Sequence, residues 1–179
     1  MPQDEHKEGI GGMINPRRYG IERVAYLLMR LSGLGLLAYF IGHIYISAKQ
    51  YKKAETILLA LTEEHPEDFK LWNNLAWLYA TAEDPSIRDG KKAIKYAHEA
   101  MTLAPNDHHV WSTLSEAHYM SGEYERAYQA IIHMTSLTTR FGQGITEESV
   151  NEYNEQIRKC KRAMDTAEAM KSGENNASE

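Results

Sequence analysis

Residues 66–81 read PEDFKLWNNLAWLYAT and residues 105–120 read PNDHHVWSTLSEAHYM, and the fold prediction starts from these two similar stretches. In both, a tryptophan follows the proline by six residues. The series Trp72, Leu75, Ala76 and Tyr79 is then matched by Trp111, Leu114, Ser115 and His118. Repetition of this kind indicates stacked units, because a single unit cannot bury its apolar faces alone.

Small residues recur in phase with these stretches. They occupy two positions of each unit: Gly42, Ala76 and Ser115 at the first, and Ala54, Ala93 and Ala127 at the second. Side chains of this size let two antiparallel helices approach closely, while the larger Trp, Leu and Tyr fill the space around the contact. The proline then ends the second helix of a unit, because it cannot continue a helix.

The pattern resembles the tetratricopeptide (TPR) repeat. The resemblance implies an all-α solenoid of about three helix-turn-helix repeats over residues 35–141, with units at 35–68, 69–107 and 108–141. The middle unit carries five extra residues in its turn, around 84–89. TPR arrays are protein-binding scaffolds, so the resemblance implies a binding function and no enzymatic activity.

The segments outside the repeats have simpler patterns. Residues 1–20 read as a flexible tail. Residues 146–171 carry apolar side chains at helical spacing and predict an amphipathic helix that caps the last repeat. Gly173 is expected to end this helix, which leaves 172–179 as a disordered tail.

The most apolar stretch is Val24–Ser47, VAYLLMRLSGLGLLAYFIGHIYIS. About 20 apolar residues suffice for a helix to cross a bilayer, so residues 21–47 predict a single membrane-spanning helix followed by a soluble C-terminal domain. Three basic residues flank each side, so the orientation in the membrane is left open. One alternative is a hydrophobic helix buried in a soluble bundle. Another is that residues 35–47 form the first helix of repeat 1.

A second resemblance lies in this segment. Arg30, Ser32 and Gly33 followed by His43 match R-x-[ST]-G-x9-H, over about residues 16–46. This resembles the first transmembrane helix of the cytochrome b membrane-anchor subunits of succinate dehydrogenase and fumarate reductase. It implies an alternative function in which His43 binds haem b and Arg30 and Ser32 contribute to a quinone site. The family uses several membrane helices and a second axial histidine, and no other segment here predicts a span.

Composition excludes several classes of function. The net charge of −5 argues against nucleic acid as a partner. The single cysteine, Cys160, rules out an intrachain disulfide. No phosphate-binding loop, zinc-protease motif or nucleophile elbow occurs. Adjacent His108 and His109 point to different helical faces, so no metal site and no cofactor are expected in the main interpretation.

The TPR resemblance also implies a groove along the first helices of the repeats, which would hold a protein or peptide ligand. Its predicted lining is Lys70, Asn73, Asn74, Trp77, His109, Ser112 and Glu116. Only Asn74 resembles the Lys, Arg and Asn clamp by which some TPR domains hold chaperone C-termini, which argues against that role. The leading hypothesis is therefore a membrane-anchored TPR scaffold for protein–protein interaction.

Overall fold

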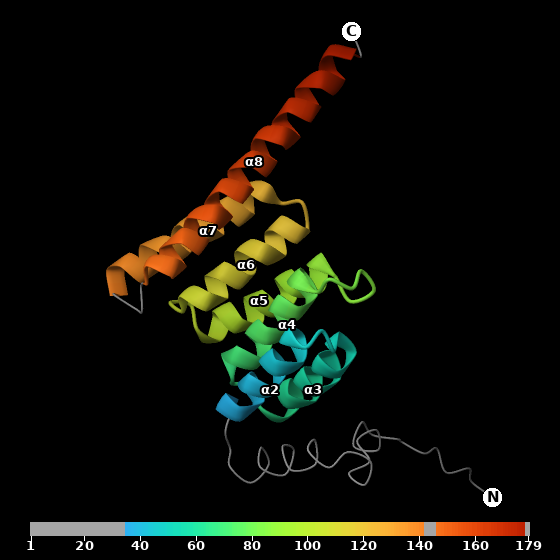
Figure 1. Ribbon diagram of the computed structural model, residues 1–179, viewed down its shortest axis with the longest axis vertical. Coiled ribbons are helices and arrows are strands. Elements are labelled where there is room, and N and C mark those ends of the chain that lie inside the picture. Colours follow the sequence, from blue (N-terminus) through green and yellow to red (C-terminus); the bar gives the residue numbers. More distant parts are fainter. Residues whose placement is uncertain (1–34, 142–145, 178–179) are drawn as a thin grey trace, which may run out of the picture.

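The structure is a computed structural model that describes residues 35–141 and 146–177. Every regular element in this part of the chain is a helix (Figure 1). The helices are α2 (Gly35–Ser47), α3 (Tyr51–Glu64), α4 (Phe69–Thr81), α5 (Gly90–Leu103), α6 (His108–Met120), α7 (Tyr124–Phe141) and α8 (Glu147–Ala177).

The helices stack in antiparallel pairs. Helix α2 packs on α3, α4 on α5 and α6 on α7, and each pair also contacts the next. The first helices of successive pairs touch one another, α2 with α4 and α4 with α6. This order confirms the predicted all-α array of repeated helix pairs.

Aspartates define where three of these helices begin. The carboxylate of Asp68 accepts a hydrogen bond from the backbone N–H of Lys70, and Asp107 accepts from His109. Asp89 does the same at the start of α5. An N-cap of this kind satisfies a donor that has no partner within the helix. Helices α4 and α6 therefore begin three residues after Pro66 and Pro105.

The spacing of proline and tryptophan has a direct cause. The indole Nε1 of Trp72 donates to the carbonyl oxygen of Pro66 at 2.8 Å, and Trp111 donates to Pro105 at 2.7 Å. The Trp72 ring also stacks on Tyr96 of α5, with 5.8 Å between centroids. Each tryptophan thus fixes the preceding turn, and Trp72 also joins the two helices of its pair.

The small residues lie at the helix contacts, as predicted. Gly42, Ala76 and Ser115 are buried, and so are Ala54, Ala93 and Ala127. Ser115 in addition donates its hydroxyl to the carbonyl oxygen of Ala127 at 2.8 Å. This hydrogen bond links the Ser115 side chain of α6 to the backbone of α7 where the two helices pack closely.

The long helix α8 packs against α7 and rises beyond the rest of the stack (Figure 1). Cys160, on its inner face, is buried.

The predicted start of α8 near residue 146 is close to the observed start at Glu147, but the predicted end was wrong. The helix continues past Gly173 to Ala177, so most of the expected disordered tail is helical. A glycine in an exposed helix costs about 1 kcal/mol relative to alanine, which is too little to end a long helix.

The apolar segment 21–47 is described only from residue 35 onward, so Arg30, Ser32 and the predicted tail 1–20 lie outside the described residues. Residues 35–47 form α2, the first helix of repeat 1. Gly42 is buried there, and Tyr45 packs on the core of the first two repeats. Among the described helices, none has the length and hydropathy needed to cross a bilayer.

Candidate protein-binding groove

A hollow of about 550 Å³ lies where α4, α6 and α8 meet. Trp77 of α4 and Ser112 and Glu116 of α6 form one side. The other side belongs to α8 and consists of Glu152, Tyr153, Glu155, Gln156, Lys159 and Arg162. The first helices of two repeats thus supply one wall and the capping helix supplies the other.

Trp77 is the large apolar side chain of this hollow. Its neighbours Ala76 and Leu78 are fully buried, whereas Trp77 is 36% exposed. The difference follows from helical geometry, because consecutive residues lie about 100° apart around the axis. An exposed tryptophan in a concave site can contribute strongly to binding, since aromatic residues dominate contact energies at protein interfaces.

Glu116 links the two walls. Its carboxylate accepts hydrogen bonds from Lys159 Nζ at 2.8 Å and from Gln156 Nε2 at 2.8 Å. The Glu116 side chain is only 17% exposed, so this ion pair is partly screened from water. Charge-assisted hydrogen bonds of this kind hold α8 at a fixed place beside α6.

The structure brings together three of the predicted groove residues, Trp77, Ser112 and Glu116. Asn74 is instead buried, with its amide nitrogen facing Gly42 of the first repeat. Lys70, Asn73 and His109 do not line the same hollow. The amide oxygen of Asn73 is buried and accepts no hydrogen bond from the described residues.

His109 is exposed at the start of α6, and its ring lies 3.9 Å from that of His108. Although its edge reaches solvent, surrounding protein atoms partly desolvate the ring, and this together with nearby His108 lowers its pKa. His109 is therefore neutral at physiological pH and presents a hydrogen-bonding ring, not a positive charge.

The haem and quinone residues of the alternative interpretation are not assembled in the described part of the chain. His43 is exposed on α2, with Nδ1 3.5 Å from the hydroxyl of Ser47. Arg30 and Ser32 lie outside the described residues. Within those residues, no three histidine, cysteine or carboxylate side chains converge as a metal site would require.

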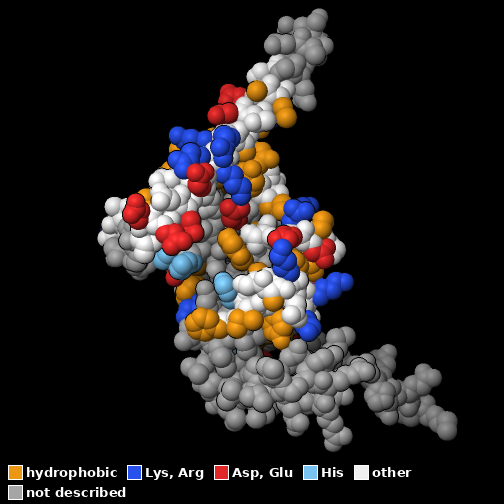
Figure 2. All heavy atoms as spheres, in the orientation of Figure 1, with side chains coloured by type: hydrophobic (Ala, Val, Ile, Leu, Met, Phe, Trp, Pro, Cys, Tyr) orange, Lys and Arg blue, Asp and Glu red, His pale blue; other side chains and the backbone are white. Residues whose placement is uncertain are grey.

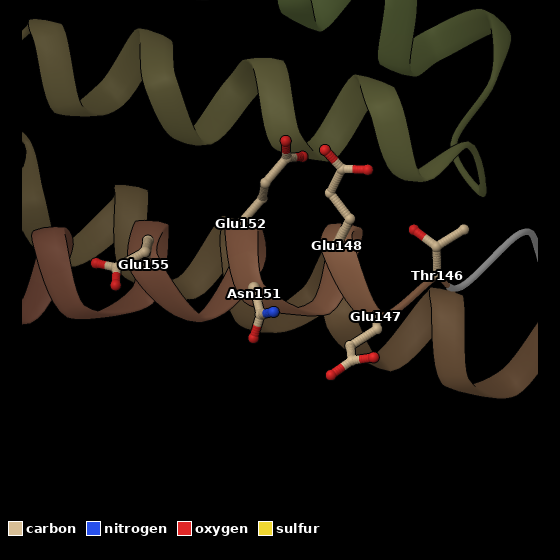
Figure 3. A pocket seen from close by; sticks show the side chains of 6 residues that line it. All are labelled: Thr146, Glu147, Glu148, Asn151, Glu152 and Glu155. Atoms are coloured by element: carbon tan, nitrogen blue, oxygen red, sulfur yellow. The ribbon is translucent and has the colours of Figure 1, made fainter.

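A second, more open hollow of about 910 Å³ continues the groove toward the start of α8 (Figure 3). Its lining is Thr146, Glu147, Glu148, Asn151, Glu152 and Glu155. Glu148 and Glu152 point the same way, while Glu147 and Asn151 point away from them (Figure 3). The carboxylates do not converge on one point, so they form an acidic margin and not an ion-binding cage.

The α8 side chains are the part of the groove that the sequence did not predict. The apolar stripe of residues 146–171 predicts only a capping helix. Lys159 could have been predicted from Glu116. A partly buried carboxylate on the inner face of the last repeat is costly unless a cation lies nearby. Spacing within α8 also places Gln156 and Lys159 on one face.

Comparisons with known proteins support the fold. No protein-family model matches the sequence, and the search of curated proteins found no significant match. Among similar solved structures is the crystal structure of the Sgt2 TPR domain from Aspergillus fumigatus, with a TM-score of 0.59 and 20% sequence identity. The alignment covers 74% of this chain and 80% of that one. The described helices therefore have a TPR-like fold.

Proposed function

We propose that this protein is a non-enzymatic interaction scaffold that holds a peptide segment of a partner protein in the groove between α4, α6 and α8. The exposed Trp77 within a concave hollow is the observation that carries the proposal. The TPR-like fold supports it, because such arrays use extended concave surfaces for binding.

The composition of the hollow supports a peptide over a small apolar molecule. Beside the Trp77 and Tyr153 rings it presents Ser112, Gln156 and several charged groups. A peptide can satisfy these groups through its backbone amides while an apolar side chain contacts the indole. Small-molecule sites are instead lined mainly by apolar side chains with few polar groups.

A photo-crosslinking amino acid at position 77 tests the proposal. In extracts that contain the native partner, we expect a crosslinked product from position 77 and none from position 132, where Ile132 of α7 is equally exposed outside the hollow. The affinity of the identified partner should then fall about tenfold or more in Trp77→Ala. It should be unchanged in Ile132→Ala. Crosslinking from both positions, or none from position 77, would contradict the proposal.

The free energy of unfolding should distinguish the roles of Trp72 and Trp77, the two tryptophans of α4. Trp72 packs on Tyr96 and bonds to Pro66, so Trp72→Ala should lower the free energy of unfolding by about 3 kcal/mol. Trp77→Ala should cost much less, about 1 kcal/mol, because 36% of the residue is already exposed. Urea unfolding of both variants measures the difference, and equal losses would show that Trp77 is a core residue.

Membrane attachment through residues 21–47 is a separate part of the proposal. It is motivated by the apolar composition of this segment. A span over these residues would require α2 to leave the first repeat. Carbonate extraction of membranes from cells that express the full chain tests it, and complete release into the soluble fraction would count against it.

The respiratory-anchor alternative is tested by an absorption spectrum of the purified protein. It requires a Soret band that is lost in His43→Ala.

A further inference from the structure

A third hollow of about 430 Å³ continues the groove in the opposite direction, past the end of α6. Tyr119 and Tyr124 flank the turn between α6 and α7, and α8 supplies the rest of the lining: Lys159, Arg162, Ala163, Thr166, Ala167 and Met170. Its size falls within the roughly 300–1,000 Å³ of ligand clefts. Lys159 and Arg162 line both this hollow and the one at Trp77.

The charge of this hollow is positive. Lys159 and Arg162 line it, and no carboxylate does. Lys159 is held by Glu116 and lies 4.0 Å from the centre of the Tyr119 ring. Arg162, by contrast, is exposed and makes no salt bridge within the described part of the chain. Its nearby carboxylate, Glu155, is already bound to Arg158 at 2.5 Å.

Apolar surface lies beside this guanidinium. The rings of Tyr119 and Tyr124 are 5.3 Å apart and tilted by 56°, and they form one side of the hollow. Met170 is 65% exposed on the opposite side, with Ala163 and Ala167 between. Methionine adapts its shape to different apolar side chains and packs favourably on aromatic rings. The site therefore combines Arg162, which makes no salt bridge with the described residues, with space for one large apolar side chain.

We infer that this hollow docks a partner segment in which aspartate or glutamate side chains flank a large apolar residue. The carboxylate binds Arg162, whose planar guanidinium can hold it through two parallel hydrogen bonds, and the apolar side chain packs among Tyr119, Tyr124 and Met170. This inference rests on the proposed function and adds the chemistry of the partner.

The distribution of charge along α8 gives the bound segment a direction. Glu148, Glu152 and Glu155 line the wall near the start of the helix, whereas Lys159 and Arg162 line it further on. Figure 2 shows basic side chains gathered over the middle of α8, with acidic ones nearer its start and a few more beyond them. An acidic segment is repelled at the first end and attracted at the second. The acidic segment of the partner therefore lies at Arg162 and not at the start of α8.

Three peptide libraries and the full-length protein test the inference. The first holds short peptides with Leu, Phe or Met at the centre and Asp or Glu on both sides. The second replaces the acids by Asn or Gln, and the third replaces the central residue by Ser. We expect enrichment from the first library only. The strongest binder, labelled with fluorescein, then serves as the probe in anisotropy titrations.

Four substitutions on α8 locate the site. Arg162→Gln should weaken the probe about tenfold or more, because a charge-assisted hydrogen bond is lost, and the loss should shrink at high salt. Lys161→Gln removes the same charge from the preceding residue, whose ammonium lies over the Tyr128 ring of α7, and should leave affinity nearly unchanged. Glu152→Gln, at the acidic end, should not weaken binding. Met170→Ser should weaken it without loss of helicity.

Each alternative outcome has a distinct meaning. Equal affinity of wild type and Arg162→Gln, or equal enrichment from the uncharged library, would overturn the inference. If binding depends on Trp77 and not on Met170, which lines only the third hollow, the groove at Trp77 is retained as the site and the third hollow is not. If no peptide is enriched and vesicles of phosphatidylcholine with phosphatidylserine bind in an Arg162-dependent manner, the surface recognises lipid and the inference fails.

Discussion

Gly42 determines how closely the first repeat can pack. A Cβ atom at this position would lie 2.6 Å from Leu58 Cδ2 and 3.2 Å from Asn74 Nδ2. Leu58 is fully buried, so it cannot move into solvent to make room. The absence of a side chain here is therefore a requirement of the contact between α2, α3 and α4.

Gly42→Ala sets two opposing effects against each other. Alanine is favoured over glycine in a helix by about 1 kcal/mol, whereas overpacking a buried contact costs about 1–3 kcal/mol. We expect the second effect to win, with a net loss of about 1 kcal/mol in urea unfolding. Gly90→Ala is the control, because its Cβ would come closest to the hydroxyl of exposed Ser121, which can rotate away by giving up its hydrogen bond to the Ala117 carbonyl oxygen. A Gly42→Ala protein as stable as wild type would contradict this account.

At the scale of helices, the connection between α6 and α7 depends on a buried histidine. His118 Nδ1 and Glu123 Oε2 are 2.9 Å apart, and Glu123 also accepts from Arg126 at 2.9 Å. His98 of α5 lies near, with its ring 6.4 Å from that of His118. Burial lowers the pKa of His118, and although Glu123 opposes this, the net shift is downward. His118 is thus neutral in the folded protein at neutral pH.

This shift predicts how stability depends on pH. A histidine whose folded pKa lies below its unfolded value of about 6.5 gives its full contribution above that pH and loses it as the pH falls through the folded pKa. We expect a lower melting temperature at pH 5.5 than at pH 7.5. His118→Gln should reduce the difference, and His109→Gln should reduce it further, because the pKa of His109 is lowered as well. An unchanged pH dependence in the double variant would exclude both groups.

The helix pairs could be predicted because their buried contacts leave a clear pattern in the sequence. Buried contacts tolerate few residue types, so Ala76, Ser115 and Ala127 identified the helix pairs from sequence. The end of α8 was missed because an exposed helix end leaves little trace in composition. The groove was predicted from one wall only, since the side chains of α8 acquire their role through contacts with α6, some 40 residues earlier, such as Gln156 with Glu116.

At the scale of the whole molecule, the two ends of the described array differ. One end is closed by α8, which packs on α7 and reaches across to α6 through Glu116. The other end is α2, where Phe40 is 50% exposed and Ile44 is 61% exposed. In a solenoid each repeat is stabilised mainly by its neighbours, so a terminal helix that lacks a neighbour on one side is less stable than an inner one.

Removal of α2 tests this view of the array. A fragment of residues 48–179 uncovers Ala54, Leu58 and Leu61 of α3, which are at most 3% exposed in the full array. We expect α3 to fray, so that helicity falls by more than α2 alone contributes and the melting temperature drops. A fragment of residues 35–179 keeps α2 and is the matched control. If both fragments unfold with the same midpoint and cooperativity, α2 is not part of the folded unit, and residues 35–47 would be free to serve the membrane-spanning role that their composition predicts.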